Sequence, residues 1–155
     1  MIERFIEFTS NISLAYKHIM KIKGEHMAVF GLKASHVMGL FNIGQSDQGL
    51  TAGDLIRLCR EDKAGISKCL ATLKNQGLIA ADDDNGNKKY RAVYTLTEKG
   101  TEVYRQVSDI ILQVVQQSGQ GLSESERTTF YRALGIIVGN LEKICTKMET
   151  PNASD

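Results

Sequence analysis

The sequence has no tryptophan, a single proline and few aromatic residues, and it contains no long apolar run. No stretch approaches the roughly 18 uninterrupted apolar residues of a membrane span, so we expect no membrane partner. Apolar and charged residues alternate at the N-terminus, which is not the layout of a signal peptide. The three cysteines are odd in number and lack metal-type spacing. They favour a reducing cytoplasm over a disulfide framework.

Signatures of catalysis and of strong charge are also missing from the sequence. It has no glycine-rich phosphate loop, paired-carboxylate motif or nucleophile elbow, so it predicts neither an enzyme nor a cofactor. The net charge is +1 over 155 residues. The charge of the whole chain therefore does not identify a nucleic-acid binder, and any such role depends on where the cations lie.

What the sequence does contain is a pair of short helices with clear signals at their ends. Thr51 followed three residues later by Asp54 is a capping box and predicts the start of the first helix. Asp62 caps the second, which runs over 62–76 and stops at Gly77 in the pattern of a Schellman motif. Two short helices joined by a three-residue turn predict a helix-turn-helix with 62–76 as the recognition helix.

A hairpin is predicted directly after this unit. Two strand-like runs, 78–81 and 89–96, flank an Asn85-Gly86 dipeptide, which is a strong tight-turn signal. In the returning strand Tyr90, Ala92, Tyr94 and Leu96 share one face, and basic residues lie on the other. The sequence therefore predicts a wing with a basic rim.

Long apolar stripes flank this central unit. Helical spacing over 2–23 predicts an amphipathic helix that Gly24 ends, and a shorter helix is expected over 34–43. After the hairpin, Thr97 caps a long helix, and a capping box at Ser123 begins another. Three stripes of this size exceed what a small winged-helix core covers. A larger monomeric helical core is one interpretation, and a helical dimer interface is the one we favour.

The predicted fold class is mainly α with a small β-hairpin wing. It is a winged helix-turn-helix whose N- and C-terminal helices form a dimerisation region. The predicted segments are an N-terminal dimerisation helix and connection over 1–32, a DNA-binding lobe over 33–100, C-terminal dimerisation helices over 101–148 and a flexible tail over 149–155.

Four segments resemble, in this order, the MarR family of bacterial transcriptional regulators. They are Leu50–Leu55, Ile66–Leu70, Leu73–Ile79 and Leu96–Gly100. The resemblance implies a homodimer in which the first helix and the last two form the dimerisation region. It also implies a recognition helix in the major groove and a wing in the neighbouring minor groove. Members are commonly repressors, often released by small molecules that bind between the dimerisation region and the DNA-binding lobe.

The wing departs from the pattern of that family. Many members carry an aspartate followed by arginines at the hairpin, whereas this chain has Asn87-Lys88-Lys89-Tyr90-Arg91. Lysine neutralises phosphate but lacks the planar guanidinium fork of arginine. The acidic run 82–84 also brings like-charge repulsion close to DNA. We expect this wing to hold DNA more weakly, or in another way.

The predicted recognition helix presents its cations away from the core. Because Ile66, Leu70 and Leu73 face inward, the opposite side is exposed. DNA binding requires cations at phosphate spacing and short polar groups on a helix that fits the major groove. The candidate DNA-binding residues are Lys63, Ser67, Lys68 and Lys74 on the helix, and Lys88, Lys89 and Arg91 on the wing. Over 60–91, seven basic residues against five acidic ones leave an excess of only two positive charges, so a solvated charged face is the alternative.

Candidate effector residues are apolar or aromatic, and they fit a plain core equally well. They are Tyr16, Phe30, His36 and Phe41. Glu25, His26 and His36 raise the alternative of a metal sensor, but their spacing matches no established site, and we predict none.

Cys59 and Cys69 lie on the two helices of the DNA-binding unit, which raises a thiol switch as another alternative. We favour buried, unreactive thiols, since no adjacent cation clearly activates either one. The sequence thus favours a dimeric regulator of transcription that binds double-stranded DNA at a pseudo-palindromic operator, a repressor released by a small-molecule effector. The alternative is a winged-helix protein-interaction module without DNA binding.

Overall fold

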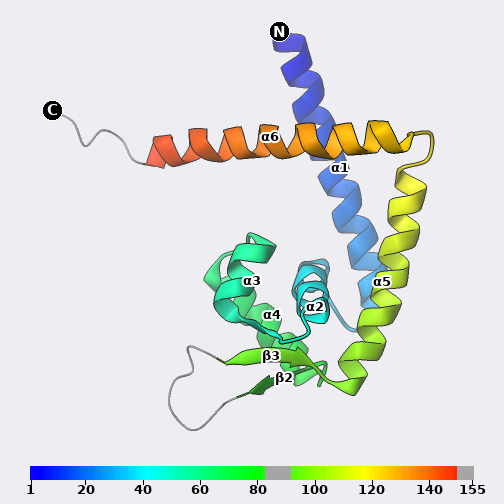
Figure 1. Ribbon diagram of the computed structural model, residues 1–155, viewed down its shortest axis with the longest axis vertical. Helices are drawn as coiled ribbons and strands as arrows, with labels where there is room; N and C mark the ends of the chain where they lie inside the picture. Colours follow the sequence, from blue (N-terminus) through cyan, green and yellow to red (C-terminus); the bar gives the residue numbers. More distant parts are fainter. Residues whose placement is uncertain (83–91, 150–155) are drawn as a thin grey trace, which may run out of the picture. The chain divides into compact units, whose positions relative to one another are not determined.

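The computed structural model describes residues 1–82 and 92–149. The chain divides into two compact units, Met1–Leu112 and Gln113–Asp155. The first unit contains, in order, α1 (Ile2–Ala28), the 3-10 helix η1 (Ala34–His36), α2 (Val37–Gly44), β1 (Leu50–Thr51), α3 (Ala52–Cys59), α4 (Lys63–Asn75), β2 (Ile79–Asp82), β3 (Val93–Leu96) and most of α5 (Glu98–Ser118) (Figure 1). The second unit contains the end of α5 and α6 (Glu124–Glu149).

The first helix is longer than the sequence predicted. Gly24 was expected to end it, but α1 continues to Ala28. The stop is at Gly31, whose φ of +66° suits a residue without a side chain, and the amide of Leu32 donates to the carbonyl of Met27 at 3.0 Å. Burial of Met27 in the core outweighs the modest cost of a glycine inside a helix.

The helix-turn-helix forms as predicted, with each capping signal in use. The amide of Asp54 donates to Thr51 Oγ1 at 3.2 Å, and the amide of Thr51 donates back to Asp54 Oδ2 at 3.1 Å, which completes the capping box of α3. Arg60 adopts the left-handed conformation and ends α3. Asp62 Oδ1 accepts from the amide of Gly65 at 2.6 Å and so starts α4.

The end of α4 is a Schellman motif, as the sequence predicted. Gly77 has a φ of +69°. Its amide donates to the carbonyl of Lys74, and the amide of Leu78 donates to the carbonyl of Leu73, both at 2.9 Å. Because Leu73 and Leu78 are both buried, the hydrophobic contact that accompanies this motif is also present.

The sheet has three strands in the order β1-β3-β2, with antiparallel pairing throughout. The hairpin of β2 and β3 was predicted, and Ile79 pairs with Leu96 in its register. The short strand β1 was not predicted, because two residues are too few to show an alternating pattern. It pairs Leu50 with Tyr94 and so ties the start of α3 to the hairpin.

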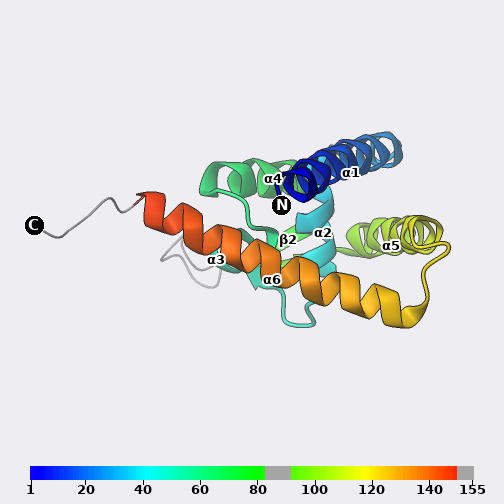
Figure 2. The same ribbon diagram turned by 90° about the horizontal axis from the view of Figure 1, so that it is seen from above.

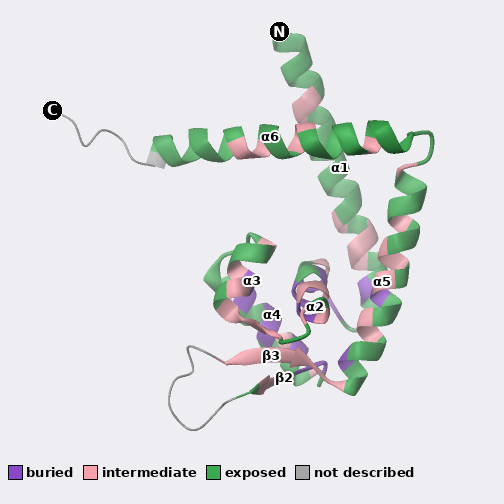
Figure 3. Cartoon of the chain, viewed as in Figure 1, coloured by how far each residue is buried: buried purple, intermediate pink, exposed green. Residues whose placement is uncertain are grey.

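The buried core lies entirely in the first unit, around α2 (Figure 3). In both ribbon views α2 lies between α4 and α5 (Figure 1, Figure 2). Helices α2 and α4 approach closely at Gly39, where a Cβ would lie 2.6 Å from Cys69 Sγ. On the side of α5, the rings of Phe41 and Tyr104 pack with their centroids 5.7 Å apart. A small residue on α2 thus permits the close approach that holds α4 in place.

The long helices after the sheet also start as predicted. Thr97 Oγ1 accepts from the amide of Gly100 at 3.0 Å at the start of α5. Before α6, the amide of Ser123 donates to Glu126 Oε2 at 2.8 Å in a capping box. Helix α6 extends to Glu149, and the rest of the predicted tail, 150–155, lies outside the described residues. Among the described helices, none is long and apolar enough to cross a membrane.

Candidate nucleic-acid interface

Helix α4 buries one face and exposes the other as the sequence predicted. Ile66, Leu70 and Leu73 are buried in the core. The exposed face carries all four helix residues predicted to contact DNA, namely Lys63, Ser67, Lys68 and Lys74. A capped start and a glycine stop fix the length of this face, so its cations have defined positions along the helix.

Two hollows flank the exposed face of α4. One, of about 550 Å³, lies against α3 and β3, and its lining includes Lys63, Ser67 and Lys74. The other, of about 500 Å³, lies against η1, and its lining includes Lys68. Ala71 lines both hollows and therefore marks the ridge between them. The cations of α4 are thus distributed over both flanks of its exposed face.

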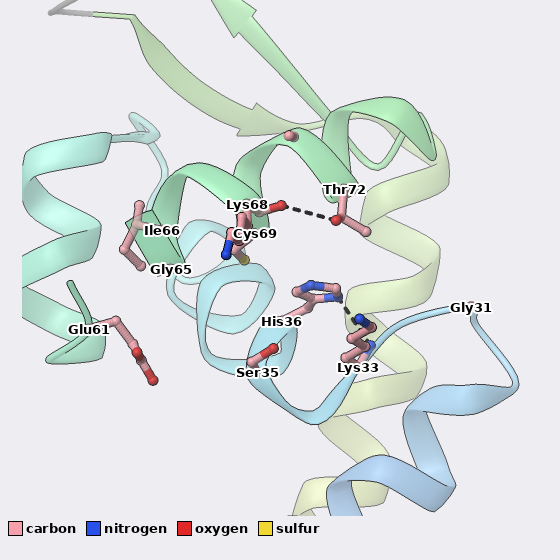
Figure 4. A pocket seen from close by; sticks show the side chains of 11 residues that line it. Gly31, Lys33, Ser35, His36, Glu61, Gly65, Ile66, Lys68, Cys69 and Thr72 are labelled. Atoms are coloured by element: carbon pink, nitrogen blue, oxygen red, sulfur yellow. Dashed lines mark hydrogen bonds between the residues drawn. The ribbon is translucent and has the colours of Figure 1, made fainter. Parts of the chain in front are cut away.

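The hollow beside η1 brings together residues that sequence analysis did not connect. Figure 4 shows Lys68, Cys69 and Thr72 of α4 across from Ser35 and His36 of η1. Lys33, just before η1, adds a second cation to this lining, and Glu61 adds an anion. Lys33 and Ser35 were missed because they lie 30 or more residues before Lys68, and only the packing of α2 against α4 brings them close.

His36 lines this hollow and accepts a hydrogen bond from the backbone. Its Nδ1 accepts from the amide of Lys33 at 3.1 Å (Figure 4). Burial, and secondarily the charge of Lys33, lower the pKa of the His36 imidazole. Protonation of Nδ1 would remove the acceptor that caps η1, so the fold favours the neutral ring.

The wing residues cannot be placed in the same way. Lys88, Lys89, Arg91 and the predicted turn at Asn85-Gly86 lie outside the described residues. Within the described part of the hairpin, Asp82 is exposed at the end of β2, and Tyr94 lines the hollow on the α3 side of α4.

The four candidate effector residues do not share one of the three hollows described at the surface. His36 lines the hollow beside α4. Phe30 lines a third hollow, of about 420 Å³, with Gln76 and Lys99. Phe41 packs on Tyr104, and Tyr16 is exposed on α1.

The surroundings of Cys59 and Cys69 raise the pKa of both thiols. Burial, together with the neighbouring Cys59 and Glu61, raises the pKa of Cys69 to about 11. Burial also raises the pKa of Cys59, although Asn42 Nδ2 donates to its sulfur at 3.5 Å. These environments do not activate a nucleophilic thiolate. Among residues 1–82 and 92–149, no three His, Cys, Asp or Glu side chains come together to hold a metal ion.

Residues 32–100 match the family described as the winged helix DNA-binding domain. Over these residues the chain has the fold of a winged helix domain. The match agrees with the prediction that the chain is not an enzyme. No curated protein matches the chain in sequence.

Solved structures share the fold of the winged helix domain and of the helices around it. A Listeria monocytogenes protein assigned to the MarR family and solved with a 26mer DNA has a TM-score of 0.80 at 20% identity, covering 95% of this chain and 97% of that chain. Staphylococcus aureus MepR, solved in a DNA complex, has a TM-score of 0.78 at 18% identity, covering 86% and 97%. A MarR transcriptional regulator from Methanosarcina mazei Go1 has a TM-score of 0.74 at 18% identity, covering 88% and 97%.

These similarities confirm the predicted fold class, a mainly helical chain with a small sheet built around a winged helix. They also confirm, at the level of the fold, the resemblance to the MarR family that the four sequence segments indicated. The winged helix domain supplies the surface on which the candidate DNA-binding residues of α4 lie.

Proposed function

We propose that this protein is a sequence-specific DNA-binding regulator of transcription that acts as a homodimer on a pseudo-palindromic operator. The observation that carries the proposal is the exposed face of α4. Its cations are spaced along a helix of defined length, in a domain of the winged helix DNA-binding family. In this proposal α4 enters the major groove and the wing reaches toward the neighbouring minor groove.

The distribution of cations around α4 supports this arrangement. A helix in the major groove has a phosphate backbone on each side, so cations on both flanks of the helix neutralise both strands. Lys63 and Lys74 line the flank beside α3, and Lys68 lines the flank beside η1. Lys33 extends the second flank beyond α4 and is a further candidate for a phosphate contact.

Two of the similar structures were solved with DNA, and this supports a DNA partner for the present chain. They are the L. monocytogenes protein with a 26mer DNA and the S. aureus MepR–DNA complex. In the proposed dimer the two α4 helices lie about 34 Å apart, one turn of B-DNA, so that both read the same face of the operator.

Exposed apolar side chains on the long helices support the proposed dimer. Ile2, Phe5 and Ile6 of α1 are exposed, as are Phe130, Ile137 and Leu141 of α6. Soluble proteins rarely leave contiguous apolar faces of this kind in water, and a second copy of the chain would cover them.

Repression and its release by a small-molecule effector are the finer part of the proposal. In this proposal the ligand binds more tightly when the two α4 helices have a spacing that does not fit the operator. It can lower operator affinity by no more than the ratio of its own affinities for the two spacings. Tyr16, Phe30, His36 and Phe41 remain the proposed effector residues, with the ligand unspecified. Release of the duplex by a compound that also raises the melting temperature of the free protein would support this part.

Titration of DNA by the full chain tests the proposal. Lys68→Ala should weaken binding to a selected operator duplex by about 10-fold, as expected for loss of a contact worth about 1–3 kcal/mol. Lys89→Ala should weaken specific and non-specific binding alike and reduce the salt dependence. If neither substitution alters the titration, the assigned residues are wrong.

A second titration separates DNA binding from the protein-interaction alternative. A winged helix that only recruits proteins would bind no random-sequence duplex even at low salt, whereas the proposed regulator binds it with strong salt dependence. The exposed Asp82 at the end of β2 and the net charge of +1 are the features that favour this alternative.

A further inference from the structure

The end of α4 is linked to two other helices through a single residue, Gln76. The side-chain Nε2 of Gln76 donates to the carbonyl of Gly31, in the turn that follows α1, at 2.7 Å. The main-chain carbonyl of Gln76 accepts from Lys99 Nζ, in the first turn of α5, at 2.8 Å. Gln76 is the C-cap of α4, so both bonds act where the recognition helix stops.

The partner residues are themselves held by the backbone. Gly31 has a φ of +66° in the turn that ends α1, and a Cβ there would lie 3.2 Å from Gln76 Nε2. On the other side, Thr97 Oγ1 donates to the carbonyl of Gly77 at 2.7 Å. At Gly100, a Cβ would collide with the carbonyl oxygen of Leu78. The link therefore joins three helix ends whose backbones have little freedom to shift.

We infer that Gln76 is a positioning residue, which sets the orientation of the recognition helix relative to α1 and α5 without contacting DNA. The inference rests on the proposed function, in which α1 contributes to the dimer and α4 reads the operator. In a dimer, a small rotation of each α4 about its C-terminal end changes the distance between the two α4 helices. The amide of Gln76 opposes that rotation, because its bond to Gly31 breaks when α4 turns away from α1.

Two substitutions remove the donated bond while keeping the length of the side chain. Gln76→Met has no donor, and Gln76→Glu places a carboxylate against the carbonyl of Gly31. Asn75→Asp is the matched control, since it makes the same amide-to-carboxylate change on the neighbouring residue, which lines the same hollow. Each variant of the full chain is titrated with an operator duplex selected from a random-sequence pool by the unsubstituted protein, and with a scrambled duplex.

Gln76→Met should weaken operator binding by about 5-fold, the effect of one neutral hydrogen bond, with scrambled-duplex binding unchanged. The salt slope should also stay unchanged, because no phosphate contact is lost. Asn75→Asp should change operator and scrambled binding by the same factor, whereas Gln76→Glu should lower operator binding further.

Duplexes with one base pair added or removed between the half-sites measure the preference for half-site spacing. A residue that only stabilised the fold would leave this preference unchanged. The unsubstituted protein should discriminate against both, and Gln76→Met should discriminate less. An unchanged ratio of operator to scrambled binding in Gln76→Met, together with an unchanged spacing preference, would overturn the role of Gln76 alone. Failure of the unsubstituted protein to bind any duplex would overturn the proposed function, and the role of Gln76 with it.

Discussion

Two regions of this chain place their apolar side chains in opposite environments. In the winged helix domain and the parts of α1 and α5 that pack on it, the buried core extends from Met27 to Val107 and is closed by these helices and the sheet. In α6, and in α1 before Met27, large apolar side chains stay exposed on helices with polar residues between them. The lobe therefore owes its fold to internal packing, whereas the long helices gain most from a partner.

The largest effect is expected when a buried leucine of the core is truncated. Leu40 on α2 is 0% exposed and Leu141 on α6 is 45% exposed, so the same truncation to alanine samples both regions. Leu40→Ala should lower the free energy of unfolding by about 2–5 kcal/mol, independent of protein concentration. Leu141→Ala should cost less and should act by weakening the dimer, so its effect should shrink on dilution toward concentrations at which both proteins are monomers. Urea unfolding at two protein concentrations measures both. Equal, concentration-independent losses would contradict the contrast.

The second prediction concerns the exposed face of α6. Ile137→Glu places a charge on this face and should weaken self-association by at least about 10-fold, because buried apolar contacts dominate such interfaces. Sedimentation equilibrium measures the dimer constant. Asn140→Glu on the same helix is the control for added charge. If the unsubstituted protein sediments as a monomer at micromolar concentration, the proposed dimer is wrong.

The third prediction uses the cysteines as probes of the same two regions. At pH 8 a thiol with a pKa of about 11 is roughly one part in a thousand thiolate, so Cys69 should alkylate very slowly. Cys145, exposed on α6, should alkylate first, and Cys59 should lie between them. Mass spectrometry after timed iodoacetamide quenching gives the order, and labelling in urea gives the unfolded reference. Early modification of Cys69 would show that α2 and α4 separate readily, and it would revive the thiol-switch alternative.

The smallest expected effect is the response of the lobe to acid. The folded-state pKa of His36 is lowered, so the unfolded chain binds a proton first as the pH falls. The stability linked to this pKa difference is fully present above the pKa of His36 in the unfolded chain, near 6.5. It decreases as the pH falls toward the lower pKa of His36 in the folded protein. The melting temperature should therefore fall between pH 7.5 and pH 5.5, and His36→Asn, whose oxygen accepts from the same amide, should reduce that fall. An identical pH response in both proteins would remove His36 as its cause.

Sequence reasoning succeeded where a local signal determined the structure. Thr51 with Asp54, Asp62, Gly77 and Ser123 each use only near neighbours, and each cap formed as predicted. It failed at Gly24, because the burial of Met27 that extends α1 depends on tertiary packing. The strand β1 was too short to show a period, and its pairing with β3 is non-local.

The residues of the candidate site also fall into those that local sequence signals predicted and those that depend on distant contacts. The exposed face of α4 followed from helical periodicity alone, since Ile66, Leu70 and Leu73 fixed its inner side. Lys33, Ser35 and Gln76 gave no comparable signal. Their positions beside α4 or at its end depend on contacts between segments far apart in the chain, such as the bond of Gln76 to Gly31.

The central claim is that the exposed face of α4, and not the cations of the long helices, binds DNA. The salt dependence of binding to a random-sequence duplex tests it with two double variants. One combines Lys68→Ala with Lys74→Ala on α4, and the other combines Lys143→Ala with Lys147→Ala on α6. The α4 pair should lower the slope of log affinity against log salt concentration by about 1–2, because each phosphate contact contributes about 0.9. The α6 pair should leave it unchanged. Equal slopes for the unsubstituted protein and the α4 pair, or a larger loss from the α6 pair, would contradict the account.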